Sequence, residues 1–414
     1  MIYKRKPVVF IIFIFILLSV SANFGRVKTN DIPYVILISF DGFRWDYPQR
    51  GLTPNLELMA QNGVSALSLK PVFPTKTFPN HYSIITGLYP VNHGIIFNDF
   101  FDKFQQKRYK VGDVESIRNA QWYWGEAFWE TAERQGIKTG SYFWPGSELK
   151  LDYRRPTFFE FYDHDRPYPE RIETVLKWLS LPAARRPHFV TLYFDATDTY
   201  GHRHGPNSPE TDQAIRRLDN ILGKLFDGLK QIGIEHQTNV IVVSDHGMSE
   251  VSDQRLINID RLISDFKFKT QGDGPVMMLN CGEDEIDAIY QILQRQQKHF
   301  RVYLREQVPE YYHFSAHPYI SPLVLIADPG WSLVRGISSN LNYRFLTKGN
   351  HGYDNHHLDM HGIFYALGPA FKNGYRTGTL LNIDIYPLIC AIFNIIPRQN
   401  IDGKLARIGF ILKQ

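Results

Sequence analysis

Aspartate ends each of three short apolar runs, and these carboxylates are the first residues that could do chemistry. The runs are rich in β-branched residues and are typical of strands buried on both faces. The carboxyl ends of parallel strands meet at one edge of a sheet, where ligands bind in such folds. We therefore expect carboxylates from distant segments to converge there. The runs are Val35 to Asp41, Phe189 to Asp195 and Val240 to Asp245.

Histidines accompany these aspartates at spacings that suit a metal ion. His246 directly follows Asp245, and Gly247 permits a sharp turn that would let both side chains reach one ion. His202 lies four residues after Asp198, a spacing that one helical turn brings onto a common face. The structural alternatives are a histidine packed in a loop and a polar turn with incidental histidines.

A histidine-rich segment, Gly349 to Gly362, offers further ligands near the C-terminus. At most one or two of its histidines can bind a metal directly. His351, in a glycine-flanked loop, is the best placed. We expect His356 and His357 to face solvent and His361 to lead into a strand.

Some polar residues near these blocks have a structural alternative to metal binding. His204 is expected not to bind a metal directly and at most to contact a ligand, and Asp195 is expected to be a helix cap. Asp41 with Gly42 also matches a common turn pattern, so this pair alone does not indicate a metal site.

Thr77 is the candidate nucleophile. It lies two residues before Pro79, and proline favours the first turn of a helix, so Thr77 is expected near a helix N-cap. Capping is the structural alternative. The catalytic hypothesis uses the same position, because the positive helix end and an adjacent metal would stabilise an alkoxide.

Strands and helices alternate along the chain, which predicts an α/β fold with a mostly parallel central sheet and helices on both faces. Helical patterns occur at 170–181 and 210–233. Composition changes over 254–349, with a polar helix near 283–299 and an irregular segment at 311–318. We interpret 254–349 as an inserted smaller subdomain within one catalytic domain, 31–397.

The N-terminus predicts export. Three basic residues precede an apolar run and small residues, so residues 1–22 match a secretory signal peptide, and the run is short for a membrane span. A retained membrane anchor is the alternative; after cleavage no stable membrane span is expected. The protein would then be periplasmic or secreted.

Charge and cysteine content limit the remaining function classes. Without the leader, 43 basic residues face 42 acidic ones, which argues against a nucleic-acid polymer as partner. A small anionic substrate remains compatible because a metal supplies local positive charge. The two cysteines, Cys281 and Cys390, make no disulfide scaffold, and their pairing is left open, as is the oligomeric state.

Five separated blocks together resemble the nucleotide pyrophosphatase/phosphodiesterase family of the alkaline phosphatase superfamily, in its bacterial-type form with a single catalytic domain. The resemblance extends from about residue 31 to residue 397. It implies an alkaline phosphatase-like fold. The blocks are Ser39 to Arg44, Thr75 to Tyr82, Asp198 with His202, Ser244 to Met248, and Gly349 to Asn355.

The resemblance also divides the ligands between two zinc ions. It implies that one zinc is held by Asp41, Asp245 and His246 and touches the Thr77 oxygen. The other would be held by Asp198, His202 and His351. Histidine and carboxylate sets also accept manganese, iron or cobalt.

The family implies further substrate contacts. Asn98 matches an asparagine that steadies a phosphate oxygen together with the amide after the nucleophile; a turn is its structural alternative. Phe78 and Tyr162 match aromatic residues that stack on a nucleobase, and Trp144 lies nearby in the sequence. A core role is the alternative for each of them. The Asp99 to Asp102 segment departs from the family, which often has Met-Tyr there.

The predicted reaction is in-line attack by Thr77 on a nucleotide phosphodiester or pyrophosphate, giving a covalent threonine intermediate that water hydrolyses. A choline- or glycerol-type phosphodiesterase acting on phospholipid headgroups is the main alternative, with Tyr162, Asp163 and Asp165 as the cation site. A monoesterase would need a cation beside the nucleophile, for which Lys76 or Arg44 could serve. A binding protein with an inactive site is the remaining alternative.

Overall fold

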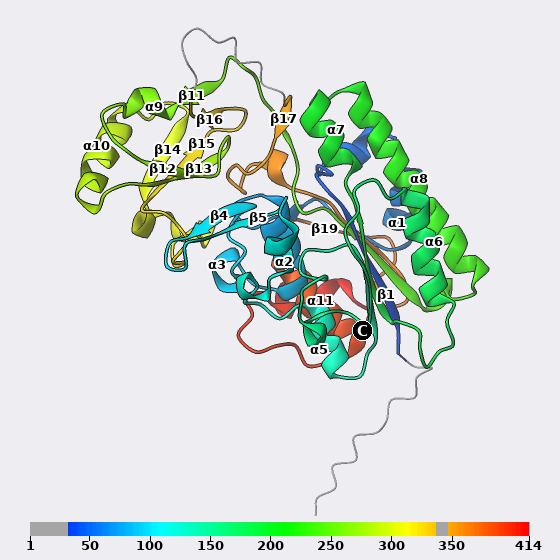
Figure 1. Ribbon diagram of the computed structural model, residues 1–414. Helices are drawn as coiled ribbons and strands as arrows, with labels where there is room; N and C mark the ends of the chain where they lie inside the picture. Colours follow the sequence, from blue (N-terminus) through cyan, green and yellow to red (C-terminus); the bar gives the residue numbers. More distant parts are fainter. Residues whose placement is uncertain (1–31, 337–346, 414) are drawn as a thin grey trace, which may run out of the picture.

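The computed structural model describes residues 32–336 and 347–413, and a twisted eight-stranded sheet forms its centre (Figure 1). Strand β1 lies between β8 and β9 and is parallel to both, and β6 and β7 continue the parallel arrangement beyond β8. On the other side, β18 is antiparallel to β9 and β2, and β19 is parallel to β2. The order is β19 (Tyr375–Thr377), β2 (Val64–Ala66), β18 (Phe364–Leu367), β9 (Thr238–Val243), β1 (Tyr34–Phe40), β8 (Phe189–Phe194), β6 (Thr139–Tyr142) and β7 (Phe158–Glu160).

Alternate residues of β1 enter two separate hydrophobic cores. Val35 and Leu37 belong to one buried cluster, and Ile36 and Ile38 belong to the other. Side chains of a strand point alternately to opposite faces, so an uninterrupted apolar strand requires cover on both sides. Figure 1 shows that cover. One face carries α1 (Pro54–Asn62), α6 (Tyr168–Leu179) and α8 (Pro209–Gln231), and the other carries α2 (Thr77–Thr86), α5 (Phe128–Arg134) and α11 (Ile385–Phe393).

The predicted α/β class and mostly parallel sheet are therefore confirmed. The helices predicted at 170–181 and 210–233 are α6 and α8, each beginning one or two residues earlier than expected. The strand predictions agree with β1, β8 and β9 except that the terminal aspartates lie just beyond the strands.

A second, four-stranded antiparallel sheet lies within residues 254–349, at the upper left of Figure 1. It has its own buried cluster, which includes Met277, Leu279 and Leu325. Short pairs, β10 (Ser249–Glu250) with β17 (Gly349–Asn350) and β11 (Leu256–Asn258) with β16 (Ser332–Val334), join the two ends of the segment. The order is β12 (Lys269–Gln271), β13 (Val276–Asn280), β15 (Leu323–Ala327) and β14 (Phe300–Leu304), with α10 (Ile286–Gln296) beside it. This arrangement suits an inserted subdomain, which stays our interpretation.

The predicted polar helix at 283–299 corresponds to α10. Both cysteines are free thiols, Cys390 in the core and Cys281 partly exposed. Residues 1–22, the predicted leader, lie outside the described residues. Within 32–336 and 347–413, no helix has the length and apolar character needed to cross a bilayer.

Candidate metal centre and active site

Three aspartates from distant segments, Asp41, Asp198 and Asp245, converge at the carboxyl edge of the central sheet. Asp41 directly follows β1, and Asp245 lies two residues beyond β9. Asp198 lies in the first turn of α7 (Ala196–His204), which begins after β8. Gly42 makes the convergence possible: its φ is +64°, and a Cβ there would lie 2.9 Å from the Asp198 Cα.

Asp41, Asp245 and His246 form one buried group that could hold a metal ion. His246 Nε2 lies 3.3 Å from Asp41 Oδ1 and 3.1 Å from Asp245 Oδ2. Tyr193 donates its hydroxyl hydrogen to Asp41 Oδ2 at 2.5 Å, and the Gly42 N–H donates to Asp245 Oδ1 at 3.3 Å. One oxygen of each carboxylate is thus fixed by a donor while the other faces the group.

Asp198, His202 and His351 form a second group of the same kind. Asp198 Oδ1 lies 3.3 Å from His202 Nε2 and 3.5 Å from His351 Nε2. The two groups adjoin, since the rings of His351 and His246 stack with centroids 3.5 Å apart.

Each of the three histidines turns its Nδ1 toward a backbone carbonyl. The carbonyls belong to Gly349 for His202, Gly247 for His246 and Thr75 for His351, at 2.7–2.9 Å. A hydrogen bond at Nδ1 places the proton there and leaves the Nε2 lone pair free for a metal. All three Nε2 atoms are the ones that face the carboxylates.

Three buried carboxylate oxygens in this cluster have no hydrogen-bond partner among the described residues, namely Asp41 Oδ1, Asp198 Oδ1 and Asp245 Oδ2. Burial raises the pKa of Asp41 well above its ordinary value, and the charges of Asp245 and Asp198 add to the rise. Buried unpaired carboxylates are costly unless paired or bound to metal. The donor set therefore fits two divalent cations bound by nitrogen and oxygen.

Thr77 lies at the rim of the first group. It is the first residue of α2, and its Oγ1 lies 3.3 Å from His246 Nε2. Thr77 lies one residue after the N-cap position, which Lys76 occupies, so it is near the N-cap as predicted; the structural alternative of a capping role is not seen, because no described side chain caps this helix. Thr77 instead directs its hydroxyl toward a candidate metal ligand at the positive helix end.

The Asn98 side chain contacts the backbone amide of the residue that follows Thr77. The Phe78 N–H donates to Asn98 Oδ1 at 3.1 Å. The amide group after Thr77 and the Asn98 side chain, expected to act together, are thus adjacent. The segment Asp99–Asp102, whose sequence differs from the family pattern, forms strand β4, which pairs antiparallel with β5 (Lys107–Lys110).

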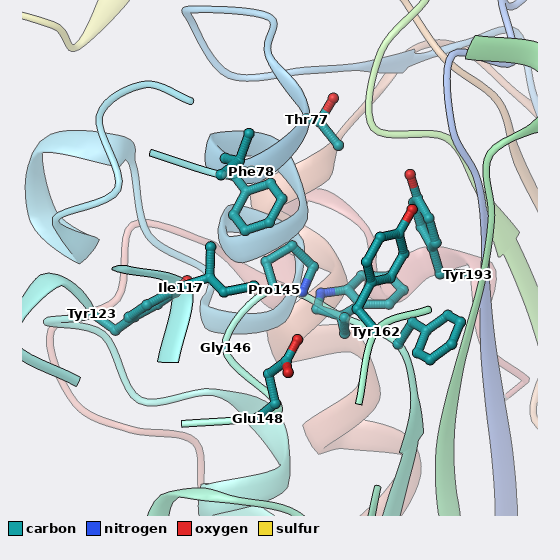
Figure 2. Close-up of a pocket in the computed structure, with 12 residues that line it drawn as sticks. Thr77, Phe78, Ile117, Tyr123, Pro145, Gly146, Glu148, Tyr162 and Tyr193 are labelled. Carbon is teal, nitrogen blue, oxygen red and sulfur yellow. The ribbon is translucent and has the colours of Figure 1, made fainter. Parts of the chain in front are cut away.

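An apolar pocket of about 210 Å³ opens next to Thr77 (Figure 2). Phe78 and Tyr162 lie on different sides of it, and Trp144 lines it while donating its Nε1–H to the His81 carbonyl. Phe143 has a φ of +68°, which is strained for a bulky residue. This conformation lies immediately before the Trp144 and Pro145 turn that forms the wall.

Sequence reasoning missed three side chains here. His81 lies four residues after Thr77 on α2, and its Nδ1 is 2.9 Å from the Thr77 carbonyl and 3.3 Å from Asp245 Oδ2. This spacing was a signal that could have identified it. Tyr193, which binds Asp41, and Glu148, which lines the pocket, carried no comparable local signal.

His356 and His357 are exposed, as predicted, and His361 precedes β18. His204 is exposed and stacks on Tyr200, outside both candidate metal groups. Asp195 occupies the N-cap position of α7, but its carboxylate accepts hydrogen bonds from tyrosine and threonine hydroxyls rather than capping the backbone.

Comparison with known proteins agrees with this geometry. A model of the type I phosphodiesterase/nucleotide pyrophosphatase family matches residues 35–354. Ectonucleotide pyrophosphatase/phosphodiesterase family member 1 of Mus musculus is 37% identical over 393 residues, 92% of this chain and 43% of that protein. Family member 5 of Homo sapiens is 35% identical over 384 residues, 92% of this chain and 78% of that protein.

Solved structures show the same likeness. Human ectonucleotide pyrophosphatase/phosphodiesterase 5 aligns with a TM-score of 0.85 and 33% identity, covering 92% of this chain and all of that one. The murine counterpart, described as an inactive threonine-to-alanine form in complex with AMP, aligns with a TM-score of 0.86, 32% identity, and coverage of 92% of this chain and 100% of that one.

The fold is therefore alkaline phosphatase-like, and the two acidic and histidine groups lie where its parallel strands end. The chain belongs to the type I phosphodiesterase/nucleotide pyrophosphatase family. It spans less than half the length of the family member 1 relatives that it matches.

Proposed function

We propose that this chain is an exported, zinc-dependent hydrolase that cleaves nucleotide phosphodiester or pyrophosphate bonds with Thr77 as nucleophile. The observation that carries the proposal is the position of the Thr77 hydroxyl, 3.3 Å from His246 Nε2 and at the mouth of an aromatic pocket. A phosphorus atom beside Thr77 would thus adjoin the metal groups on one side, with a base in the pocket on the other.

Asp41, Asp245 and His246 would hold one zinc ion, and Asp198, His202 and His351 the other. Bound zinc ions supply positive charge that lowers the pKa of a hydroxyl and neutralises phosphate oxygens. Two Zn²⁺ per chain match two separate three-ligand groups.

The chain's own residues do the positioning. Thr77 Oγ1 attacks phosphorus in line, the leaving oxygen departs on the opposite side, and water later hydrolyses the threonine ester. Asn98, held by the Phe78 N–H through Oδ1, can offer its amide hydrogens to a non-bridging oxygen. Phe78, Tyr162 and Trp144 form apolar walls that exclude water and stack on a base.

A diester preference is supported by the residues near Thr77. Arg44 is occupied elsewhere: it donates to both Asp46 oxygens, to the Met248 carbonyl and to Asn207. Lys76 is the remaining cation considered for a monoester, and burial lowers its pKa from the ordinary lysine value. Neither Arg44 nor Lys76 thus offers a freely available positive charge for the second negative charge of a monoester.

Export is supported by the match of residues 1–22 to a signal peptide and by the names of the relatives, which include ectoenzymes and venom phosphodiesterases. We place the mature protein in the periplasm or outside the cell.

A substrate panel tests the proposed reaction. Purified protein is assayed with p-nitrophenyl esters of adenosine 5′-phosphate, thymidine 5′-phosphate and phosphorylcholine, and with p-nitrophenyl phosphate. We expect the nucleotide esters to have the highest kcat/KM. Preference for the choline ester would instead support the headgroup phosphodiesterase, and preference for p-nitrophenyl phosphate a monoesterase.

Thr77→Ala tests the nucleophile. Turnover should fall by at least about a thousandfold, since the attacking group is lost. Metal content, measured by mass spectrometry, should stay near two per chain. Thr86→Ala is the matched control, because Thr86 ends the same helix and donates only to the Tyr82 carbonyl. Turnover by Thr77→Ala within tenfold of the unmodified enzyme would contradict covalent catalysis.

A further inference from the structure

His81 is a buried histidine beside the first candidate metal group, and both of its ring nitrogens are already engaged. Nε2 lies 2.8 Å from Ser39 Oγ, and Nδ1 lies 2.9 Å from the Thr77 carbonyl oxygen. The residue is fully buried, and it belongs to neither candidate metal group in the described structure. In the three histidines of those groups, by contrast, Nε2 faces a carboxylate. His81 is therefore placed to hold other groups in position rather than to bind an ion.

The Nδ1 atom of His81 joins the candidate nucleophile to a candidate metal ligand. It lies 2.9 Å from the Thr77 carbonyl oxygen and 3.3 Å from Asp245 Oδ2. A carbonyl oxygen can only accept a hydrogen bond, so Nδ1 carries the hydrogen, with the Asp245 carboxylate as its second oxygen neighbour. Thr77 begins α2 and Asp245 follows β9, so this one N–H group couples two elements that are far apart in the sequence.

Three further groups fix the orientation of the His81 ring. In the neutral ring Nε2 accepts the hydrogen of the Ser39 hydroxyl, and Ser39 lies on β1. Trp144 and Tyr193 pack edge to face with the ring, with centroids 5.0 Å and 5.3 Å away. Trp144 also donates its Nε1–H to the His81 carbonyl at 2.9 Å. The ring therefore has little freedom to turn, and its Nδ1–H keeps one direction.

We propose that His81 is a positioning residue: its Nδ1–H ties the backbone of Thr77 to Asp245, so that the Thr77 hydroxyl keeps its place beside the first metal group. This role rests on the proposed nucleotide-cleaving function. In-line attack needs the hydroxyl at a defined distance and angle from phosphorus, and a misplacement of about 1 Å can lower the rate about a hundredfold. Without the Nδ1–H, α2 and Asp245 can move apart, and the attacking oxygen is no longer fixed relative to the metal group.

Two substitutions distinguish the two ring nitrogens. The side chain of asparagine can place its NH₂ group near the position of Nδ1, whereas that of glutamine can place it near the position of Nε2. His81→Asn should therefore keep the donor to Thr77 and Asp245, and His81→Gln should lose it. Glutamine is closer to histidine in size, so a role in packing alone would favour His81→Gln.

The kinetic test compares these variants at saturating Zn²⁺ with the p-nitrophenyl ester of thymidine 5′-phosphate. We expect His81→Gln and His81→Leu to lower kcat about a hundredfold, with KM within about threefold of that of the unmodified enzyme. His81→Asn should restore kcat to within about tenfold of the unmodified enzyme. The loss should fall on kcat, because His81 does not line the aromatic pocket.

His93→Leu is the matched control for His81→Leu. His93 is equally buried, and its Nε2 lies 2.9 Å from Ser83 Oγ, on the same helix as Thr77. Its other described contacts are with the Pro79 carbonyl and the Tyr82 ring, away from both candidate metal groups. It should keep kcat within about threefold of that of the unmodified enzyme.

A metal titration tests the same contact without substrate. Metal-free protein is titrated with Zn²⁺ against a chromophoric chelator. Loss of a group that orients a metal ligand weakens binding by about tenfold to a hundredfold. One binding step should therefore weaken in His81→Gln and stay near that of the unmodified protein in His81→Asn.

The outcomes separate this role from the function on which it rests. A kcat for His81→Gln equal to or above that of His81→Asn, or a loss confined to KM, would overturn the positioning role and leave the nucleotide-cleaving function standing. If the unmodified protein hydrolyses no nucleotide ester, the proposed function fails, and the Zn²⁺ titration of the two variants still decides whether His81 orients Asp245. If His81→Leu fails to fold, the comparison of His81→Asn with His81→Gln decides.

Discussion

Replacing Tyr193 with phenylalanine should weaken metal binding at one of the two candidate sites. The Tyr193 hydroxyl donates to Asp41 Oδ2 at 2.5 Å, while Asp41 Oδ1 faces His246 without a hydrogen-bond partner. The hydroxyl therefore holds the carboxylate so that its other oxygen can bind an ion. It also opposes the rise in the pKa of Asp41 that burial and Asp245 cause. Its removal would leave the proton a stronger competitor of the metal.

The magnitude follows from the bond that is lost. A hydrogen bond to a charged group contributes about 1.5–3 kcal/mol, which corresponds to roughly a tenfold to 150-fold change in affinity. Loss of a residue that orients a metal ligand has effects of the same order, about tenfold to a hundredfold. Only the Asp41, Asp245 and His246 group should be affected, since Tyr193 contacts no ligand of the other group in the described structure.

Metal titration is the appropriate assay, because the Tyr193 ring also lines the pocket and turnover would mix two effects. Metal-free protein is titrated with Zn²⁺ against a chromophoric chelator, and one of two binding steps should weaken. Tyr168→Phe is the control, because it removes a hydroxyl that donates to Asp195 at 3.0 Å, outside both metal groups. Unchanged affinity in Tyr193→Phe, or equal weakening of both steps, would refute the reasoning.

Two further predictions concern the backbone and pH. Gly42→Ala should lower the free energy of unfolding by roughly 1–2 kcal/mol because of its positive φ, and further because of the 2.9 Å approach to Asp198; it should also weaken Zn²⁺ binding. Gly51→Ala is the control, because Gly51 has a φ of +69° with open space around it and should show only the backbone strain in urea unfolding. Equal metal affinity in both variants would contradict the role of the close approach to Asp198. Burial lowers the pKa of His93 from 6.5 to about 3, so stability is full above pH 6.5 and falls by about 1.4 kcal/mol per pH unit below it as the unfolded chain takes up the proton. Urea unfolding from pH 7 to 4.5 should show a shallower fall in His93→Gln but not in a variant of His236, whose side chain is 93% exposed.

The strand ends and the candidate metal ligands could be predicted because they are local signals. An apolar run that ends in Asp41 or Asp245 carries both the buried strand and its functional terminus within eight residues. The alternation of such apolar runs with helical segments likewise predicted the mostly parallel sheet. The spacing of Asp198 and His202 likewise follows from one turn of α7.

The partners of these residues could not be predicted, because they come from distant parts of the chain. Tyr193 and Asp41 are 152 residues apart in sequence, and Arg118 and Glu148 are 30 apart. Their contacts depend on the order of strands in the sheet and on the turn at Phe143. Neither feature produces a regular spacing of residues within a short segment of the sequence. For Thr77 the proline pattern predicted the helix start within one residue, but that one residue decides whether the hydroxyl caps the helix or faces His246.

The buried carboxylates connect the proposed metal binding to the fold itself. Asp41, Asp198 and Asp245 follow different strands of one sheet, and each has a buried oxygen without a hydrogen-bond partner. Burial raises the pKa of Asp41, and the negative charges of Asp245 and Asp198 add to the rise. Folding therefore brings together charges that repel, and a bound divalent cation would turn that repulsion into attraction. We therefore expect metal binding to stabilise this sheet edge, because the unfolded chain would have no preformed site.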